Sequence, residues 1–209
     1  MFLTNKDMLD LIELRHELHR HPEISGEEKE TARRIRDFLE QAKPDRMFTD
    51  LGVHGVAAVY DSGKSGPVVL IRSELDALPI QEKTDAEYRS GTDGKGHLCG
   101  HDGHSTILTA LALGLSRKRP ETGSVVLLYQ PAEETGAGAA AVIADPRFGE
   151  MKPELFLFSS QSSRPAIRPC QRGGRAGQLR ITRHQNPLLR QDRARLLTGA
   201  WRLADAGDI

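Results

Sequence analysis

Apolar residues recur at helical spacing near the start of the chain. The pattern predicts an amphipathic helix over residues 7–19, which Pro22 brings to an end. The motif SGEE that follows has the form of a capping box, with Ser25 as the N-cap residue and Glu28 reaching back to it. We therefore expect a second helix to begin immediately after this motif.

Further along the chain, short apolar runs alternate with helical patterns. Residues 55–60 (GVAAVY) and 67–72 (PVVLIR) predict two strands separated by a turn, and residues 125–129 predict a third strand. Helices are expected over about residues 103–116 and 136–143. Because these strands are apolar throughout, we predict an α/β fold with a mainly parallel sheet and helices on both faces. Functional residues in such sheets gather beyond the carboxyl ends of the strands.

The apolar pattern breaks down at Ser159, and the charge changes at the same point. Residues 159–209 hold ten arginines, no lysine and three aspartates, a balance of +7, so the first 158 residues carry −7 and the whole chain is neutral. We expect residues 1–158 to form a folded domain. Residues 159–209 are expected to be a disordered basic tail, because they contain no apolar set able to form a core.

Composition narrows the class of protein. With 209 residues, 38% hydrophobic and 28% charged, the chain resembles a globular protein and not a collagen or a coiled coil. Cys99 and Cys170 are too few for a secreted disulfide framework, which favours the reducing cytoplasm. No run approaches the roughly 20 apolar residues of a membrane span, so no membrane association is expected.

Three segments at predicted strand or helix ends contain most of the candidate chemistry. They are SELDALP at residues 73–79, HLCGHDGH at residues 97–104 and QPAEE at residues 130–134. Cys99 and His101 are two positions apart and would point the same way in an extended chain. A thiolate and an imidazole suit zinc or another borderline divalent metal.

Glu133 and Glu134 are adjacent, so their side chains are expected to diverge. This geometry fits a division of labour in which one carboxylate binds a metal ion and the other takes a proton from water. A metal ion would help because it lowers the pKa of water and polarises the carbonyl group under attack.

Other interpretations remain open for each motif. A single cysteine is more often a small buried apolar residue than a ligand, and paired glutamates are mostly solvated surface. A structural metal site usually needs four Cys or His ligands, and only one cysteine lies near these motifs. His19 and His21 could form a metal pair, although their place at a helix end favours a structural or substrate-side role.

Together with RHELHRHPE at residues 15–23, these three motifs resemble the M20 metallopeptidase and amidohydrolase family. The similarity is to its branch of hippurate hydrolases, N-acyl-amino-acid amidohydrolases and auxin-conjugate hydrolases, and covers about residues 7–158. The resemblance implies a zinc-peptidase-like α/β catalytic domain that is interrupted by a smaller dimerisation domain, so residues 1–158 are expected to form a partial catalytic domain. It also implies hydrolysis of an amide bond of an N-acyl amino acid or small peptide, with two divalent ions of manganese, zinc or cobalt.

Carried onto this sequence, the resemblance implies that Cys99, His101 and Glu134 are metal ligands and that Glu133 is the general base. Asp76 would orient a metal-binding histidine. The family pattern also includes two further histidine ligands, one in a His-Asn context soon after the paired glutamates and one near a distant C-terminus. Neither is present here, so we expect weak metal affinity and negligible turnover. The sequence assigns no substrate-binding residue.

A one-base shift of the reading frame offers an explanation for the tail. Such a shift keeps two bases of each new codon fixed, so few residues are permitted at each position. Under this restriction codons 159–164 can read LHNLPG, and codons 179–207 can read a segment containing GKTAHAS and SPMQA. These stretches resemble the family's dimerisation domain. Our hypothesis is that the tail is an out-of-frame translation, which would also explain arginine without lysine and the loss of the dimerisation domain.

Two other classes of function compete with a hydrolase. A nucleic-acid-binding protein could use the +7 tail, although such arms usually mix lysine with arginine and interleave aromatic residues, whereas Trp201 is the single aromatic residue of the tail. A non-catalytic metal-binding fragment would bind metal without hydrolysis. The expected partner is therefore a small N-acyl amino acid or peptide, with no nucleic acid and no membrane.

Overall fold

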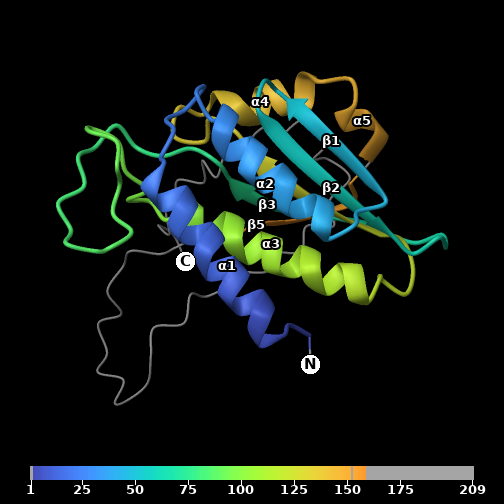
Figure 1. Ribbon diagram of the computed structural model, residues 1–209. Coiled ribbons are helices and arrows are strands. Elements are labelled where there is room, and N and C mark those ends of the chain that lie inside the picture. The colour runs from blue at the N-terminus through green and yellow to red at the C-terminus, as the bar shows by residue number, and fades with distance from the viewer. Residues whose placement is uncertain (1, 152, 159–209) are drawn as a thin grey trace, which may run out of the picture.

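The computed structural model describes residues 2–151 and 153–158 (Figure 1). The helices are α1 (Asn5–Arg20), α2 (Lys29–Gln41), α3 (His101–Arg117), α4 (Ala137–Ala144) and α5 (Phe148–Met151). The strands are β1 (Arg46–Leu51), β2 (Gly55–Asp61), β3 (Val68–Glu74), β4 (Ser124–Gln130) and β5 (Leu155–Phe158). The sequence predicted α1, α2, β2, β3, α3, β4 and α4, whereas it did not predict β1.

The five strands form one sheet in the order β1-β2-β4-β3-β5. β3 is parallel to both β4 and β5, whereas β2 is antiparallel to β1 and to β4. The predicted α/β class is confirmed, and the sheet contains both parallel and antiparallel strand pairs. β2 and β3 follow each other in the chain but do not pair, because β4 lies between them. The parallel pair β3–β4 is connected through α3, as a parallel connection requires a crossover.

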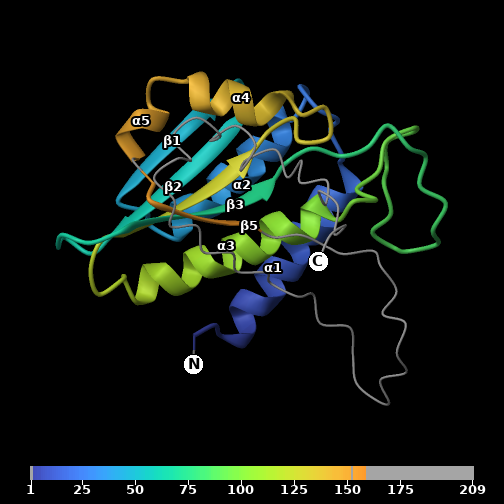
Figure 2. The same cartoon turned by 180° about the vertical axis from the view of Figure 1, so that it is seen from behind.

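Helices cover both faces of the sheet, and they form two apolar cores (Figures 1 and 2). On one face α1, α2 and α3 pack against Tyr60 and Tyr129, and on the other α4 and α5 pack against Leu70 and Leu128. Alternate residues of β2 and β4 point to opposite faces, and residues 56–60 and 126–129 are buried on both faces. This explains why these strands read as continuous apolar runs. Each buried leucine or isoleucine contributes about 1.5–3 kcal/mol of hydrophobic stabilisation.

The expected capping box at residues 25–28 is wrong. α2 begins at Lys29, and the Glu28 side chain makes no capping hydrogen bond. The N-terminus of α2 is instead capped by Glu23, whose carboxylate accepts hydrogen bonds from the backbone N–H groups of Glu30 (3.2 Å) and Thr31 (2.6 Å). Ser25 and Glu28 are thereby available for contacts with the segments that carry the candidate site.

Residues 159–209, for which a disordered tail was expected, lie outside the described residues. Among the helices that are described, none combines the length and the apolar character needed to cross a membrane.

Candidate metal and catalytic site

The candidate residues gather where the parallel strands β3 and β4 end. Glu74 and Gln130, the last residues of these strands, lie opposite each other in the sheet. The segment of residues 75–100 leaves β3 and leads to α3, and a turn that contains Glu133 and Glu134 follows β4. The three motifs therefore meet at one edge of the sheet, as the rule for parallel strands predicts.

Cys99, His101 and Glu134 lie together. Their ligand atoms, one from each residue, are all within 4.8 Å of one another. Cys99 is exposed and His101 is buried, so the group lies at the surface with one side in the protein interior. The sequence predicted that Cys99 and His101 would share a side through an extended chain. They meet by a different route, because Gly100 adopts a left-handed conformation (φ 84°) and His101 is the first residue of α3.

The His101 ring is oriented by Asp76. Nδ1 of His101 lies 2.7 Å from the Asp76 backbone carbonyl oxygen and 3.4 Å from its carboxylate. Because a carbonyl oxygen only accepts hydrogen bonds, Nδ1 carries the proton and Nε2 is left for a ligand. Nε2 is the nitrogen that faces Glu134, whose Oε1 is 3.7 Å away. Burial alone would lower the pKa of His101, but the acceptors on Asp76 and the charge of Glu74 raise it to about 9. A cation that binds Nε2 at neutral pH would therefore displace a proton from it.

The Asp76 carboxylate is fully buried and is itself held in place. Its Oδ2 accepts hydrogen bonds from the Ser25 hydroxyl (2.7 Å) and from the backbone N–H of Glu134 (2.9 Å). Burial would raise the pKa of Asp76, but the contacts with His101, Ser25 and Glu134 outweigh it and lower the pKa to about 2. Asp76 thus remains a carboxylate and connects the histidine to the turn that carries Glu134.

Glu133 lies on the same side as Glu134. The sequence predicted that the two side chains would diverge, but Oε2 of Glu133 is 3.9 Å from His101 Nε2, close to the corresponding distance for Glu134. This expectation is wrong because the chain turns here and is not extended: the Glu133 carbonyl accepts a hydrogen bond from the Gly136 N–H (2.8 Å). Burial raises the pKa of Glu133, partly offset by the Arg72 guanidinium at 3.6 Å.

The position of this turn depends on Glu28, a residue that sequence reasoning missed. The fully buried Glu28 carboxylate accepts hydrogen bonds from the backbone N–H groups of Ala132 (2.6 Å) and Gly26 (2.9 Å). Ala132 has a φ of 48°, a left-handed conformation that a non-glycine residue adopts only when its surroundings hold it there. In the sequence, Glu28 stands where a helix-capping glutamate would stand. Its contact with Ala132 could therefore not be predicted.

The protein groups around Cys99 leave a surplus of negative charge. Burial, together with the neighbouring carboxylates of Glu134, Glu133 and Asp76, raises the pKa of the Cys99 thiol to about 12. A bound cation would reverse this effect, because a coordinating thiol loses its proton. Thiolate, imidazole and carboxylate are a donor set that suits zinc and similar divalent ions. The residues present therefore fit a metal ion.

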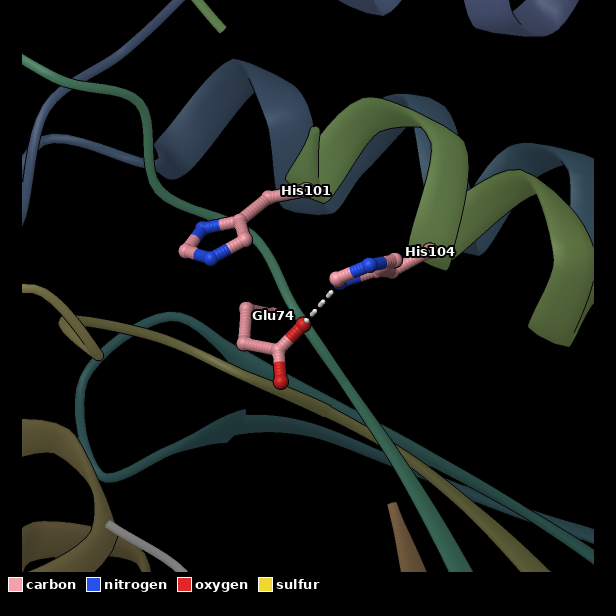
Figure 3. A group of neighbouring side chains, drawn as sticks. All are labelled: Glu74, His101 and His104. Atoms are coloured by element: carbon pink, nitrogen blue, oxygen red, sulfur yellow. Dashed lines mark hydrogen bonds and ion pairs between the residues drawn. The ribbon is translucent and has the colours of Figure 1, made fainter. Parts of the chain in front are cut away.

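A second cluster combines Glu74, His101 and His104, all buried (Figure 3). Nδ1 of His104 lies 2.8 Å from Oε2 of Glu74, and Arg72 contacts the other carboxylate oxygen at 2.9 Å. Both oxygens of Glu74 are therefore already in use, and a guanidinium stands beside them. The arrangement is better described as a buried ion pair that holds Arg72 near Glu133.

His19 and His21 do not form a metal pair. His19 is buried between two carboxylates, with Nδ1 2.8 Å from Asp102 and Nε2 3.2 Å from Glu82. His21 is half-exposed and lies 3.5 Å from Glu17 on its own helix. Glu82 and Arg72 are further residues near the site that the sequence motifs did not identify, since neither stands in a recognisable spacing.

Comparison with known proteins places this geometry in a family. The sequence pattern of Peptidase family M20/M25/M40 matches residues 70–191, more than half of the chain and past Phe158. The chain is 42% identical over 134 residues to an N-acetylcysteine deacetylase of Bacillus subtilis (strain 168), which covers 64% of this chain and 35% of that protein. It is 37% identical over 140 residues to IAA-amino acid hydrolase ILR1-like 5 of Arabidopsis thaliana, covering 66% of this chain and 32% of that protein.

A solved structure agrees with these sequence matches. The Bacillus subtilis YXEP protein, described as a dinuclear metal binding peptidase from the M20 family, superposes with a TM-score of 0.70 at 35% identity. The match covers 76% of this chain and 44% of that one. The chain spans about a third of the length of the curated relatives it matches. Sequence pattern, relatives and fold agree, and the chain belongs to Peptidase family M20/M25/M40.

Proposed function

We propose that this chain is part of a metal-dependent hydrolase that cleaves the amide bond of N-acyl amino acids or small peptides. The observation that carries the proposal is the convergence of Cys99, His101 and Glu134 within 4.8 Å, with the Glu133 carboxylate beside them. Family membership supports the same reaction class, because the relatives named above are a deacetylase, an amino-acid-conjugate hydrolase and a peptidase.

Each residue would have a distinct task. Cys99, His101 and Glu134 would hold a divalent ion. When bound, such an ion would lower the pKa of water and polarise the amide carbonyl group. Glu133 would take the proton from the attacking water and then give it to the leaving amine nitrogen. Its burial fits this task, since a carboxyl group with a raised pKa both accepts and returns a proton more readily near neutral pH. Asp76 would keep Nε2 of His101 aimed at the ion.

The metal, the substrate and the location of the protein are proposed from the resemblance. Two ions of manganese, zinc or cobalt would bind in the complete family site, of which the described residues supply three ligands. A homodimer and a cytoplasmic location are proposed for the parent enzyme. The substrate would present an acyl group on one side of the scissile amide and an amino-acid carboxylate on the other.

We also propose that residues 159–209 are an out-of-frame translation of a region that would encode the dimerisation domain. The +7 charge of this segment and its lack of lysine support the proposal. The family match up to residue 191 does not itself require a boundary at Phe158. The nucleotide sequence across codons 150–165 is the test: a one-base shift that restores LHNLPG would support the hypothesis, and an intact frame with no such reading would refute it.

The proposed activity is tested by assaying release of free amino acid from N-acetyl amino acids with Mn²⁺, Zn²⁺ or Co²⁺. The purified 209-residue chain is expected to show negligible turnover, because the ligand set is incomplete. A gene restored to the family reading frame is expected to give an active enzyme, and E133Q in that protein should lose about 100-fold or more in kcat. Clear turnover by the 209-residue chain, or a fully active E133Q enzyme, would contradict the proposal.

A further inference from the structure

His19 lies near the end of α1 with both of its ring nitrogens against carboxylates. Its ring is buried, 7% exposed, and the two carboxylates, Asp102 and Glu82, are 1% and 8% exposed. Nδ1 is 2.8 Å from Oδ2 of Asp102, and Nε2 is 3.2 Å from Oε1 of Glu82. A neutral imidazole donates from only one nitrogen, whereas an ionised carboxylate only accepts, so both contacts are hydrogen bonds when His19 is protonated.

The groups packed around His19 favour its charged form. Arg15 on the same helix donates to Asp102 at 3.2 Å. Glu82 is fixed by the Thr84 hydroxyl and by the backbone N–H of Ser90. The hydrogen bond to Asp102 raises the pKa of His19, and the contact with Glu82 adds to it, against an opposing effect of burial.

Two further rings border the same place. The Tyr88 ring packs edge-on against His19 with centroids 5.4 Å apart, and the buried His97 ring lies at 6.3 Å. Burial lowers the pKa of His97 to about 4, so this second imidazole is neutral and adds no positive charge. The two carboxylates are thus balanced by one guanidinium, Arg15, and by one imidazolium, His19.

The contacts of His19 join α1 to two parts of the chain that carry the candidate metal site. Asp102 immediately follows His101 in the first turn of α3, and Glu82 lies in the segment of residues 75–100. This segment runs from Asp76, near its beginning, to Cys99, near its end. In Figure 1 it is the green loop that leaves the body of the molecule between β3 and α3. A connection of this kind fixes the loop and the helix start relative to each other.

We propose that His19, as an imidazolium bridging Asp102 and Glu82, is a positioning residue for the Cys99–His101 pair. It contacts neither of these residues. It acts by holding the start of α3 and the segment of residues 75–100 against α1, so that the thiol and the imidazole stay within reach of one ion. The inference rests on the proposed function, because it assigns His19 a task only if Cys99 and His101 bind metal.

The chain provides a matched control at the other end of the same two helices. Asp7 of α1 accepts two hydrogen bonds from Arg117, the last residue of α3, at 2.7 and 2.8 Å. This ion pair also ties α1 to α3, but it lies about 24 Å along α3 from His101, at 1.5 Å per residue over 16 residues. A purely structural link between the helices would be weakened by loss of either contact.

The experiment measures Co²⁺ affinity in the 209-residue chain and in the variants H19Q and R117Q. Glutamine is neutral and cannot donate in two opposite directions as an imidazolium does. We expect the Kd for Co²⁺ to rise about 10- to 100-fold in H19Q, the range seen when residues that orient ligands are removed. R117Q should change Kd by less than about twofold, although both variants lower Tm.

A second measurement does not depend on metal binding. The ¹⁵N shifts of the His19 ring, assigned by comparison with H19Q, report whether both nitrogens carry protons. At about pH 7.5, where an ordinary histidine is mostly neutral, we expect two protonated nitrogens. A neutral His19 ring, or equal Co²⁺ affinity in H19Q and the wild type, would overturn this inference alone. Absence of Co²⁺ binding by the wild-type chain would overturn the proposed metal site and the inference with it.

Discussion

Replacing Asp76 by asparagine tests the structure of the site without altering its shape. The amide oxygen of D76N can occupy the position of Oδ2 and still accept from Ser25 and from the N–H of Glu134. These bonds lose the charge that strengthens them. The amide NH₂ would then stand where Oδ1 faces Nδ1 of His101, 3.4 Å away, and two donors would oppose each other.

The expected cost follows from the pKa of Asp76. Lowering that pKa from 3.8 in the unfolded chain to about 2 in the folded chain corresponds to about 2 kcal/mol of folding free energy. A second route gives a similar free energy. A hydrogen bond to a charged group contributes about 1.5–3 kcal/mol and a neutral one about 1 kcal/mol, and D76N would convert two charged bonds into neutral ones. We therefore expect D76N to unfold with about 2 kcal/mol less free energy at neutral pH.

The pH dependence has a definite sign. Because the folded pKa of Asp76 is depressed, its contribution is present above the unfolded value of 3.8 and disappears as pH falls through about 2. The wild type should therefore lose stability over this window. D76N has no such group to titrate, so the difference between the two proteins should shrink toward zero at the acid end.

Urea unfolding followed by circular dichroism, at several pH values from neutral to acid, measures this difference. D45N is the matched control, because Asp45 is an exposed carboxylate on the same protein that also accepts a backbone N–H, from Asp61 at 2.8 Å. We expect D45N to change stability little. The reasoning would be refuted if D76N matched the wild type within about 0.5 kcal/mol at neutral pH, or if the difference grew on acidification.

Two further predictions concern the supports of the site. A Cβ atom at Gly138 would lie 1.6 Å from the Pro131 carbonyl oxygen, whereas one at Gly149 would meet nothing within 4 Å. Thermal and urea unfolding should show G138A destabilised by about 1–3 kcal/mol and G149A unaffected or slightly stabilised; equal stabilities would contradict this close approach. The buried Tyr129 hydroxyl lies 3.0 Å from that of Thr109, so Y129F should cost about 1 kcal/mol by the same assay, and an unchanged midpoint would show that this bond contributes nothing.

The sequence predicted the location of the site better than its geometry. Hydrophobic runs showed where β3 and β4 end, and the rule that parallel strands share a carboxyl edge brought the three motifs together. The same reasoning was wrong about the directions of Glu133 and Glu134 and about an extended Cys99–His101 chain. Both errors arose from backbone turns, at Ala132 and Gly100, whose left-handed conformations leave no trace in periodicity.

Contacts between residues far apart in the sequence were also not predicted. The Glu28 carboxylate reaches Ala132 across 104 positions, and His19 reaches Glu82 across 63. Each is a polar side chain that folding buries beside complementary partners, so the residue type alone does not reveal the pairing. The order of the sheet was unpredictable for a similar reason: adjacent strands β2 and β3 are separated by β4, which comes later in the chain.

The central claim is that Cys99, His101 and Glu134 together hold a divalent ion. Titration of the 209-residue chain with Co²⁺ tests it directly, because a cobalt–thiolate bond gives a charge-transfer absorption that carboxylate and imidazole ligands do not. We predict that this absorption appears in the wild type and in C170S, which removes the other cysteine, and disappears in C99S. Its absence from the wild type, or its persistence in C99S, would contradict the account.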